Sequence, residues 1–275
     1  MTPSSRNREV ISFRVKSKRL PKAVSERLRH WFNRLFGFER FNALYRDLPP
    51  CPPLSLSAAI LEQSAVHLQT GGEPLASVPR SGPVIFVANH PHGLVDGFAL
   101  DCLLTPIRPE ARLMAVYALG EIPEYRGRLV LVDPQKRRSR RRQNARGWLK
   151  AHRLLAGGGA LVVFPAGGVS RFQWRRLAVE DPDWSPHIAA LARRFRATVV
   201  PIYIHGRNGW PFQLIGAIAP QLQNLFIFGE LSKMRGRTLQ LTVGRPMPES
   251  SWSQLNTDEA AIAFFRSQTE KLARF

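Results

Sequence analysis

A run of five apolar residues at 84–88 leads directly into the polar segment 89–97, Asn-His-Pro-His-Gly-Leu-Val-Asp-Gly. The length of the run and its β-branched residues predict a buried strand. A strand followed at once by histidine, glycine and aspartate is typical of an open α/β sheet, because the reactive groups of such sheets lie beyond the carboxyl ends of the strands. His90, His92 and Asp96 are therefore the first candidates for a functional site.

His90 and Asp96 have the chemistry of a base and its partner. Histidine exchanges a proton near neutral pH, and a carboxylate that fixes its tautomer and stabilises the imidazolium makes it an effective general base. A turn of the chain at Gly93 would bring the two side chains together. A histidine and an aspartate this close in sequence can also form a purely structural hydrogen bond in a loop, and His92 is an alternative base.

The rest of the chain alternates strand-like apolar runs with helical patterns. Strands are predicted at 112–117, 129–132, 160–164, 197–204 and 238–243, and helices at 94–105, 138–155, 186–195 and 257–273. Residues 58–69 fit either a short strand or a helix. This alternation predicts an α/β fold with a mixed, mostly parallel sheet flanked by helices.

An amphipathic helical arm is predicted before the α/β body. It follows a polar, basic tail over residues 1–20, and its apolar residues from Val24 to Leu35 recur on one face at helical spacing. A basic helix rich in Trp and Phe can lie on an anionic membrane surface, or it can cover the sheet with its charges solvated. The proline-rich segment 49–53 predicts a boundary between the arm, 1–50, and the body, 54–275.

The net charge of +20 favours a polyanionic partner, either nucleic acid or the anionic leaflet of a membrane. The arginine run at 137–142 is not accompanied by zinc-ligand spacing or another nucleic-acid-binding signature, so no nucleic acid is expected as a partner. Cys51 and Cys102 make no metal-binding pattern and no disulfide framework, which fits a reducing compartment.

No signal peptide and no transmembrane helix are predicted. The best candidate for a membrane span is the uncharged segment 208–229, which contains too much proline, glutamine and asparagine for a hydrocarbon core. We expect strand and loop there, packed inside the domain and lining an apolar pocket.

Segment 89–97 resembles the first signature block of the glycerolipid and lysophospholipid acyltransferase superfamily, which includes the 1-acylglycerol-3-phosphate acyltransferases. The usual block has four residues between histidine and aspartate, whereas this chain has five between His90 and Asp96 and three between His92 and Asp96. The longer spacing resembles that of a bacterial, hemolysin-like branch. The resemblance implies His90 as general base, Asp96 as its orienter and His92 as the substitute candidate.

Segment 164–171, Phe-Pro-Ala-Gly-Gly-Val-Ser-Arg, resembles the acceptor-binding block of the same superfamily. The resemblance implies that four residues of this block bind substrate: Gly167, Gly168, Ser170 and Arg171. It implies the same for Gly93 of the first block. Gly168 stands where the hemolysin-like branch usually has an acid, which puts a carboxylate role in acceptor binding in doubt.

Segment 199–208, Val-Val-Pro-Ile-Tyr-Ile-His-Gly-Arg-Asn, resembles the last block and follows the others in the expected order. Arg207 would lie at the mouth of the pocket, where a guanidinium can hold a phosphate or carboxylate through two hydrogen bonds. His205 is expected to be a polar pocket residue rather than a second base.

The resemblance implies a peripheral acyltransferase on the cytoplasmic face of the inner membrane, in contact with an anionic membrane surface. The enzyme would move a fatty acyl group from acyl-CoA or acyl carrier protein to a lyso-lipid or glycerophosphate-type acceptor, without a metal or cofactor. Backbone amides near Gly93 or Gly167 and Gly168 would stabilise the oxyanion, and no acyl-enzyme is implied. Three alternatives stay open: a catalytically silent lipid-binding homologue, a basic nucleic-acid-binding protein, and a metal hydrolase that uses His90, His92 and Asp96.

Overall fold

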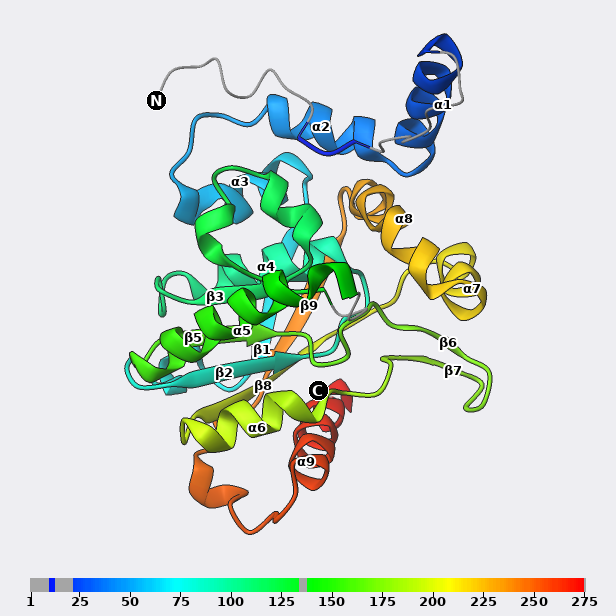
Figure 1. Ribbon diagram of the computed structural model, residues 1–275. Coiled ribbons are helices and arrows are strands. Elements are labelled where there is room, and N and C mark those ends of the chain that lie inside the picture. The colour runs from blue at the N-terminus through cyan, green and yellow to red at the C-terminus, as the bar shows by residue number, and fades with distance from the viewer. Residues whose placement is uncertain (1–9, 13–21, 134–137, 275) are drawn as a thin grey trace.

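The computed structural model describes residues 10–12, 22–133 and 138–274. Across these residues the chain forms a seven-stranded sheet in the order β1-β9-β8-β2-β5-β3-β4 (Figure 1). Its strands are β1 His67–Gly72, β2 Val84–Ala88, β3 Arg112–Ala115, β4 Leu129–Leu131, β5 Ala160–Val163, β8 Thr198–Ile204 and β9 Thr238–Val243. Only the β8–β9 pair is antiparallel among these strands. The predicted mixed, mostly parallel sheet is confirmed.

Helices cover both faces of the sheet. They are α1 Lys22–Leu35, α2 Phe38–Arg46, α3 Leu56–Gln63, α4 Leu94–Leu104, α5 Arg141–Ala156, α6 Pro186–Arg194, α7 Trp210–Ile218, α8 Pro220–Lys233 and α9 Asp258–Lys271. Phe86 of β2 packs in a core with α2, α3, α4 and α8, while Ile85 and Val87 pack in a second core with α5, α6 and α9. Successive strand residues face opposite sides, so a strand covered on both sides is apolar throughout.

The sheet brings the ends of β2, β5 and β8 to one edge. Ala88 pairs with Ile202 of β8, and Val87 pairs with Val163 of β5, so the three parallel strands end at nearly the same level. The segments that follow them therefore meet at this edge. A two-stranded hairpin, β6 Arg171–Gln173 and β7 Ala178–Glu180, projects from it.

The prediction of strand and loop at 208–229 is wrong, because this segment forms α7 and most of α8. Pro211 lies in the first turn of α7 and Pro220 in the first turn of α8. The N–H groups of a first turn have no partner within the helix, so a proline there costs no hydrogen bond. These prolines therefore mark helix starts rather than breaks. Residues 58–69 are resolved into the end of α3 and the start of β1.

The predicted helical arm is present as α1 and α2. Phe38 and Phe41 of α2 pack edge to face on Phe228 of α8. Part of the predicted loose tail is also fixed, since Ile11 is buried and exchanges two hydrogen bonds with the Asn42 side chain. Residues 1–9 and 13–21 of that tail lie outside the described residues, and the boundary at 49–53 stays a prediction.

The apolar side of α1 is only partly covered. Trp31 and Leu35 are exposed, whereas Phe32 stacks on Phe36 and packs against the first core. Within the described ranges, no helix combines the length and the apolar composition that crossing a membrane requires.

Candidate active site

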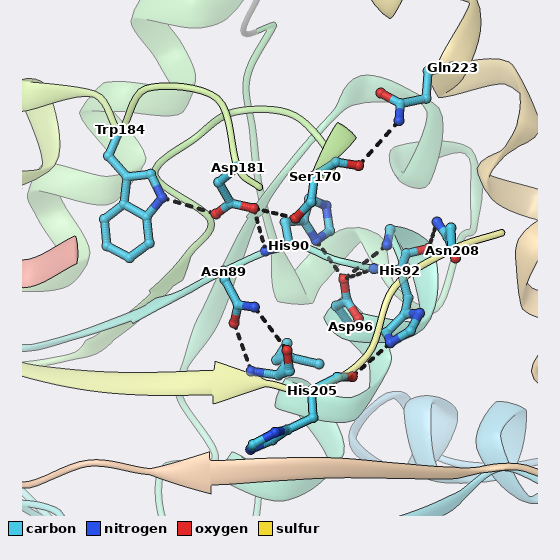
Figure 2. A network of polar contacts seen from close by, with 12 residues as sticks. Asn89, His90, His92, Asp96, Ser170, Asp181, Trp184, His205, Asn208 and Gln223 are labelled. Carbon is cyan, nitrogen blue, oxygen red and sulfur yellow. Dashed lines mark hydrogen bonds and ion pairs between the residues drawn. The ribbon is translucent and has the colours of Figure 1, made fainter. Parts of the chain in front are cut away.

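His90 and Asp96 meet at the end of β2 (Figure 2). The Nδ1 atom of His90 lies 2.9 Å from Oδ2 of Asp96, whose side chain is fully buried. The same oxygen accepts the backbone N–H groups of His92 and Gly93, each at 2.9 Å. Because the carboxylate is an acceptor, Nδ1 of His90 carries the proton and Nε2 keeps the lone pair.

The backbone before α4 makes this contact. Gly93 has φ +86° and ψ −116°, a conformation that residues with a side chain rarely adopt. A Cβ at this position would lie 3.1 Å from Ile227 and 3.3 Å from Val169, so it would also crowd both side chains. Asp96 is the third residue of α4, where backbone amides and the helix dipole stabilise a negative charge.

A second contact fixes the imidazole of His90. Its ring stacks on Phe164, with 3.8 Å between centroids and 15° between planes. Phe164 directly follows β5, the neighbour of β2. The side chain of His90 is 16% exposed, so the ring is held on two sides and still reaches solvent. Sequence reasoning placed Phe164 in a signature block without giving it this role.

A buried carboxylate that sequence reasoning missed, Asp181, lies behind His90. Its Oδ1 accepts the hydroxyl of Ser170 at 2.5 Å and the backbone N–H of His90 at 3.1 Å, and its Oδ2 accepts Nε1–H of Trp184 at 3.0 Å. Burial raises the pKa of Asp181, while the hydrogen bonds from Ser170, Trp184 and His90 lower it. The backbone N–H of Ser170 also donates to the carbonyl of His90 at 2.8 Å, so the two loops are tied together.

His92 is engaged differently from His90. Its Nε2 lies 2.9 Å from the carbonyl oxygen of His205, and its side chain is buried, so Nε2 carries a proton and donates it. Its Nδ1 is buried without a hydrogen-bond partner in the described part of the chain. His205 in turn contacts Thr242 through Nε2 at 2.8 Å, and burial lowers the pKa of His205.

Two of the three candidate glycine amides are already used. The N–H of Gly93 donates to Asp96, and the N–H of Gly167 donates to the carbonyl of Phe164 at 2.9 Å. The N–H of Gly168 makes no hydrogen bond to the residues that the structure describes. A Cβ at Gly168 would meet nothing closer than Nη1 of Arg171 at 3.9 Å, so this position is open.

The two candidate arginines differ in their surroundings. The side chain of Arg171 is partly buried, and burial lowers its pKa. Among the described residues it has no acidic partner. Arg207 is exposed, with its guanidinium carbon 5.7 Å from the centroid of the Trp210 ring. Both cations lie on segments that directly follow the site, beside α7.

The polar side chains of the site do not form a metal centre. Within the described ranges, no three His, Cys, Asp or Glu side chains converge in a way that could hold a metal ion. The arginine run is only partly described: Arg140 lies over the ring of Tyr117, and residue 137 is outside the described residues.

Comparison with known proteins gives three similarities. Residues 73–205 match the family model described as Acyltransferase. The chain is 24% identical over 264 residues to the lyso-glycine lipid O-acyltransferase of Phocaeicola vulgatus, covering 94% of this chain and 90% of that protein. It is 25% identical over 204 residues to the protein of the same name from Bacteroides thetaiotaomicron, covering 72% and 73%.

The fold is also similar to a solved structure, the 1-acyl-sn-glycerophosphate (LPA) acyltransferase PlsC from Thermotoga maritima. The TM-score is 0.52 at 14% identity, over 86% of this chain and 80% of that one. The family match over residues 73–205, the two relatives and the similar fold agree with one another, and together they support an acyltransferase of the glycerolipid acyltransferase superfamily.

Proposed function

We propose that the enzyme moves a fatty acyl group from an acyl thioester to a hydroxyl of a lyso-lipid, with His90 as general base and Asp96 as its orienter. One observation carries this proposal. The His90 ring is fixed by Asp96 at 2.9 Å and by Phe164, while its Nε2 makes no hydrogen bond within the described part of the chain. A positioned imidazole with a free lone pair is what proton removal from a hydroxyl requires.

The proposed reaction is a direct transfer. Nε2 of His90 removes the hydroxyl proton as the acceptor oxygen attacks the thioester carbonyl, and Asp96 stabilises the imidazolium that forms. The unbonded amide of Gly168 is the candidate donor to the oxyanion. When the carbon–sulfur bond breaks, the imidazolium returns its proton to the departing thiolate. Ser170 is not a nucleophile in this scheme, because its hydroxyl donates to Asp181.

The acceptor that we propose carries an anionic headgroup, as a lyso-glycine lipid does through its carboxylate. The names of the two relatives support this choice. The partly buried guanidinium of Arg171 supports it too, because a desolvated cation without an acidic partner favours binding of a carboxylate or phosphate. The donor is acyl-CoA or acyl carrier protein, no cofactor is needed, and the enzyme works as a peripheral protein on the cytoplasmic face of the inner membrane.

The acceptor assignment is tested with purified protein, radiolabelled acyl-CoA and acyl carrier protein, and three acceptors. We expect transfer to a lyso-glycine lipid to have the highest kcat/KM, lysophosphatidic acid to follow, and zwitterionic lysophosphatidylcholine to be the poorest. A preference for the zwitterionic acceptor would contradict the role of Arg171. Lipid binding without transfer from either donor would favour the catalytically silent homologue.

Asp181→Asn tests whether the clamp behind His90 matters for turnover. The amide presents N–H groups where the carboxylate now accepts three donors, so the His90 backbone should shift. We expect kcat to fall by about 10- to 100-fold, because small misplacements of a catalytic group are costly. KM should change little, since Asp181 is buried and its hydrogen bonds run to Ser170, His90 and Trp184.

The matched control for this variant is Asp183→Asn, which removes the same charge from an exposed position two residues away. It should leave kcat and Tm unchanged. If Asp181→Asn lowers Tm without lowering kcat of the folded fraction, the carboxylate serves folding alone.

A further inference from the structure

The β6–β7 hairpin, α7 and the start of α8 expose large apolar side chains. Their exposed fractions run from 44% to 77%; the residues are Trp174, Leu177, Trp210, Leu214, Ile218 and Leu222. We call them the α7–hairpin face. A surface of this kind marks an interaction site, because proteins rarely leave contiguous apolar patches without a partner.

The face is built around α7. Trp210, Leu214 and Ile218 follow one another every four residues and so lie on one side of the helix, while Phe212 and Gly216 on its other side are buried. α7 contains no charged residue at all. A short helix with a continuous apolar stripe and a Trp at its start is typical of helices that lie in the membrane interface.

The hairpin and the helix form one surface. The ring of Phe172 on β6 lies 5.0 Å from that of Trp174 and 5.9 Å from that of Trp210, which joins the two elements. Figure 1 shows the hairpin and α7 next to each other on the right of the view, with α1 above them. Trp31 and Leu35 of α1 are also exposed, but they are not counted in the α7–hairpin face.

Three cations accompany the apolar residues, and one of them, Arg176, pairs with Glu180 at 2.7 Å. Arg175 and Arg176 are exposed at the tip of the hairpin, and Arg207 lies over the Trp210 ring. Trp and Arg together suit the headgroup level of an anionic bilayer. The net charge of +20 opposes pairing of this face with a second copy of the chain. An acidic carrier protein would match the arginines but would leave the α7 stripe without an apolar partner.

We propose that the α7–hairpin face docks the enzyme on an anionic bilayer and so sets the acceptor entrance at the membrane surface. The face is continuous with the site: β6 starts directly after Ser170, whose backbone N–H bonds to the carbonyl of His90. Gln223 of α8 donates to the carbonyl of Ser170 at 3.4 Å. In this proposal a lyso-lipid enters from the bilayer at the end of the hairpin that adjoins His90. The proposal rests on the proposed function only in that the acceptor is a lipid.

The test uses the full chain and vesicles of phosphatidylglycerol with phosphatidylcholine, or of phosphatidylcholine alone, in a sedimentation assay. Leu214→Ser/Ile218→Ser should weaken binding to the anionic vesicles by at least about tenfold, because two apolar side chains no longer enter the acyl region. Leu54→Ser/Leu149→Ser is the matched control. It changes two exposed apolar residues outside the α7–hairpin face, 44% and 49% exposed against 44% and 77% for Leu214 and Ile218, and should bind as the wild type does.

Activity measured in parallel separates this proposal from the proposed function. A short-chain, monomeric lyso-lipid should be acylated equally by the wild type and by Leu214→Ser/Ile218→Ser, whereas a long-chain acceptor in vesicles should be acylated more slowly by the variant. Equal vesicle binding by both proteins overturns the membrane proposal, as does a wild-type dimer that the variant abolishes. Loss of vesicle binding in the variant, with no transfer to any acceptor by the wild type, refutes only the proposed function.

Discussion

His90→Gln is expected to lower kcat by roughly 10²- to 10⁴-fold, the usual contribution of a positioned general base. The substitution keeps a polar side chain of similar reach, so the loops held by Asp181 should stay in place. KM for both substrates should change little, because the imidazole removes the proton in the transition state and does not contribute to binding of the lipid. Steady-state kinetics with acyl thioester and lyso-lipid measure the effect.

Two further histidine variants make this result specific. His152 lies on α5, where its ring packs on Phe195. The His152→Gln variant should behave like the wild type. His92→Gln should lose stability, because a buried hydrogen bond to His205 is broken, but its folded fraction should keep most of its activity. If His92→Gln abolishes turnover while His90→Gln does not, the base has been assigned to the wrong histidine.

Asp96→Asn should reduce kcat by a similar factor, about 10²- to 10⁴-fold, for a different reason. The amide oxygen of Asn should take the place of Oδ2, because the backbone N–H groups of His92 and Gly93 also point at that atom, so Nδ1 of His90 keeps only a neutral, weaker acceptor. The imidazolium also loses its counter-charge. The cost to stability should be about 0.3–2 kcal/mol, since the charge at the start of α4 is lost while an oxygen can still accept the amides of His92 and Gly93.

Asp101→Asn is the control for this prediction, because Asp101 is the other buried carboxylate on α4. It pairs with Arg128 at 2.5 Å and accepts the hydroxyl of Ser57 at 2.6 Å, away from His90. Breaking a buried ion pair costs about 3–5 kcal/mol, so this variant should lose more stability than Asp96→Asn and keep its kcat. If both variants lose activity only in proportion to their lost stability, Asp96 has no role beyond folding.

The fold was predictable where sequence pattern and burial coincide. β2 has the expected bounds, because helices cover both faces of the sheet there and every residue of the strand must be apolar. The meeting of segments 89–97, 164–171 and 199–208 also followed from the sequence, because parallel strands that follow one another in an α/β sheet present their carboxyl ends at one edge.

The missed features depend on contacts that no local pattern contains. Asp181 lies 91 residues from His90 in the chain, and only the packing of the hairpin behind β2 joins them. Phe164 reads as the last residue of a strand until the sheet places its ring on His90. α7 and α8 were missed because the prolines of segment 208–229 were considered only as arguments against a membrane span, although both lie in the first turn of a helix.

The open space at Gly168 has a consequence for how such enzymes diverge. A Cβ introduced there would meet nothing closer than Arg171 at 3.9 Å and Pro182 at 4.0 Å, and none of the contacts that fix His90 and Asp96 pass through this position. Residue 168 can therefore change by a single mutation while the chemistry is conserved. Headgroup preference could drift at this one position among descendants of a common ancestor, each lineage inheriting the same proton-transfer pair.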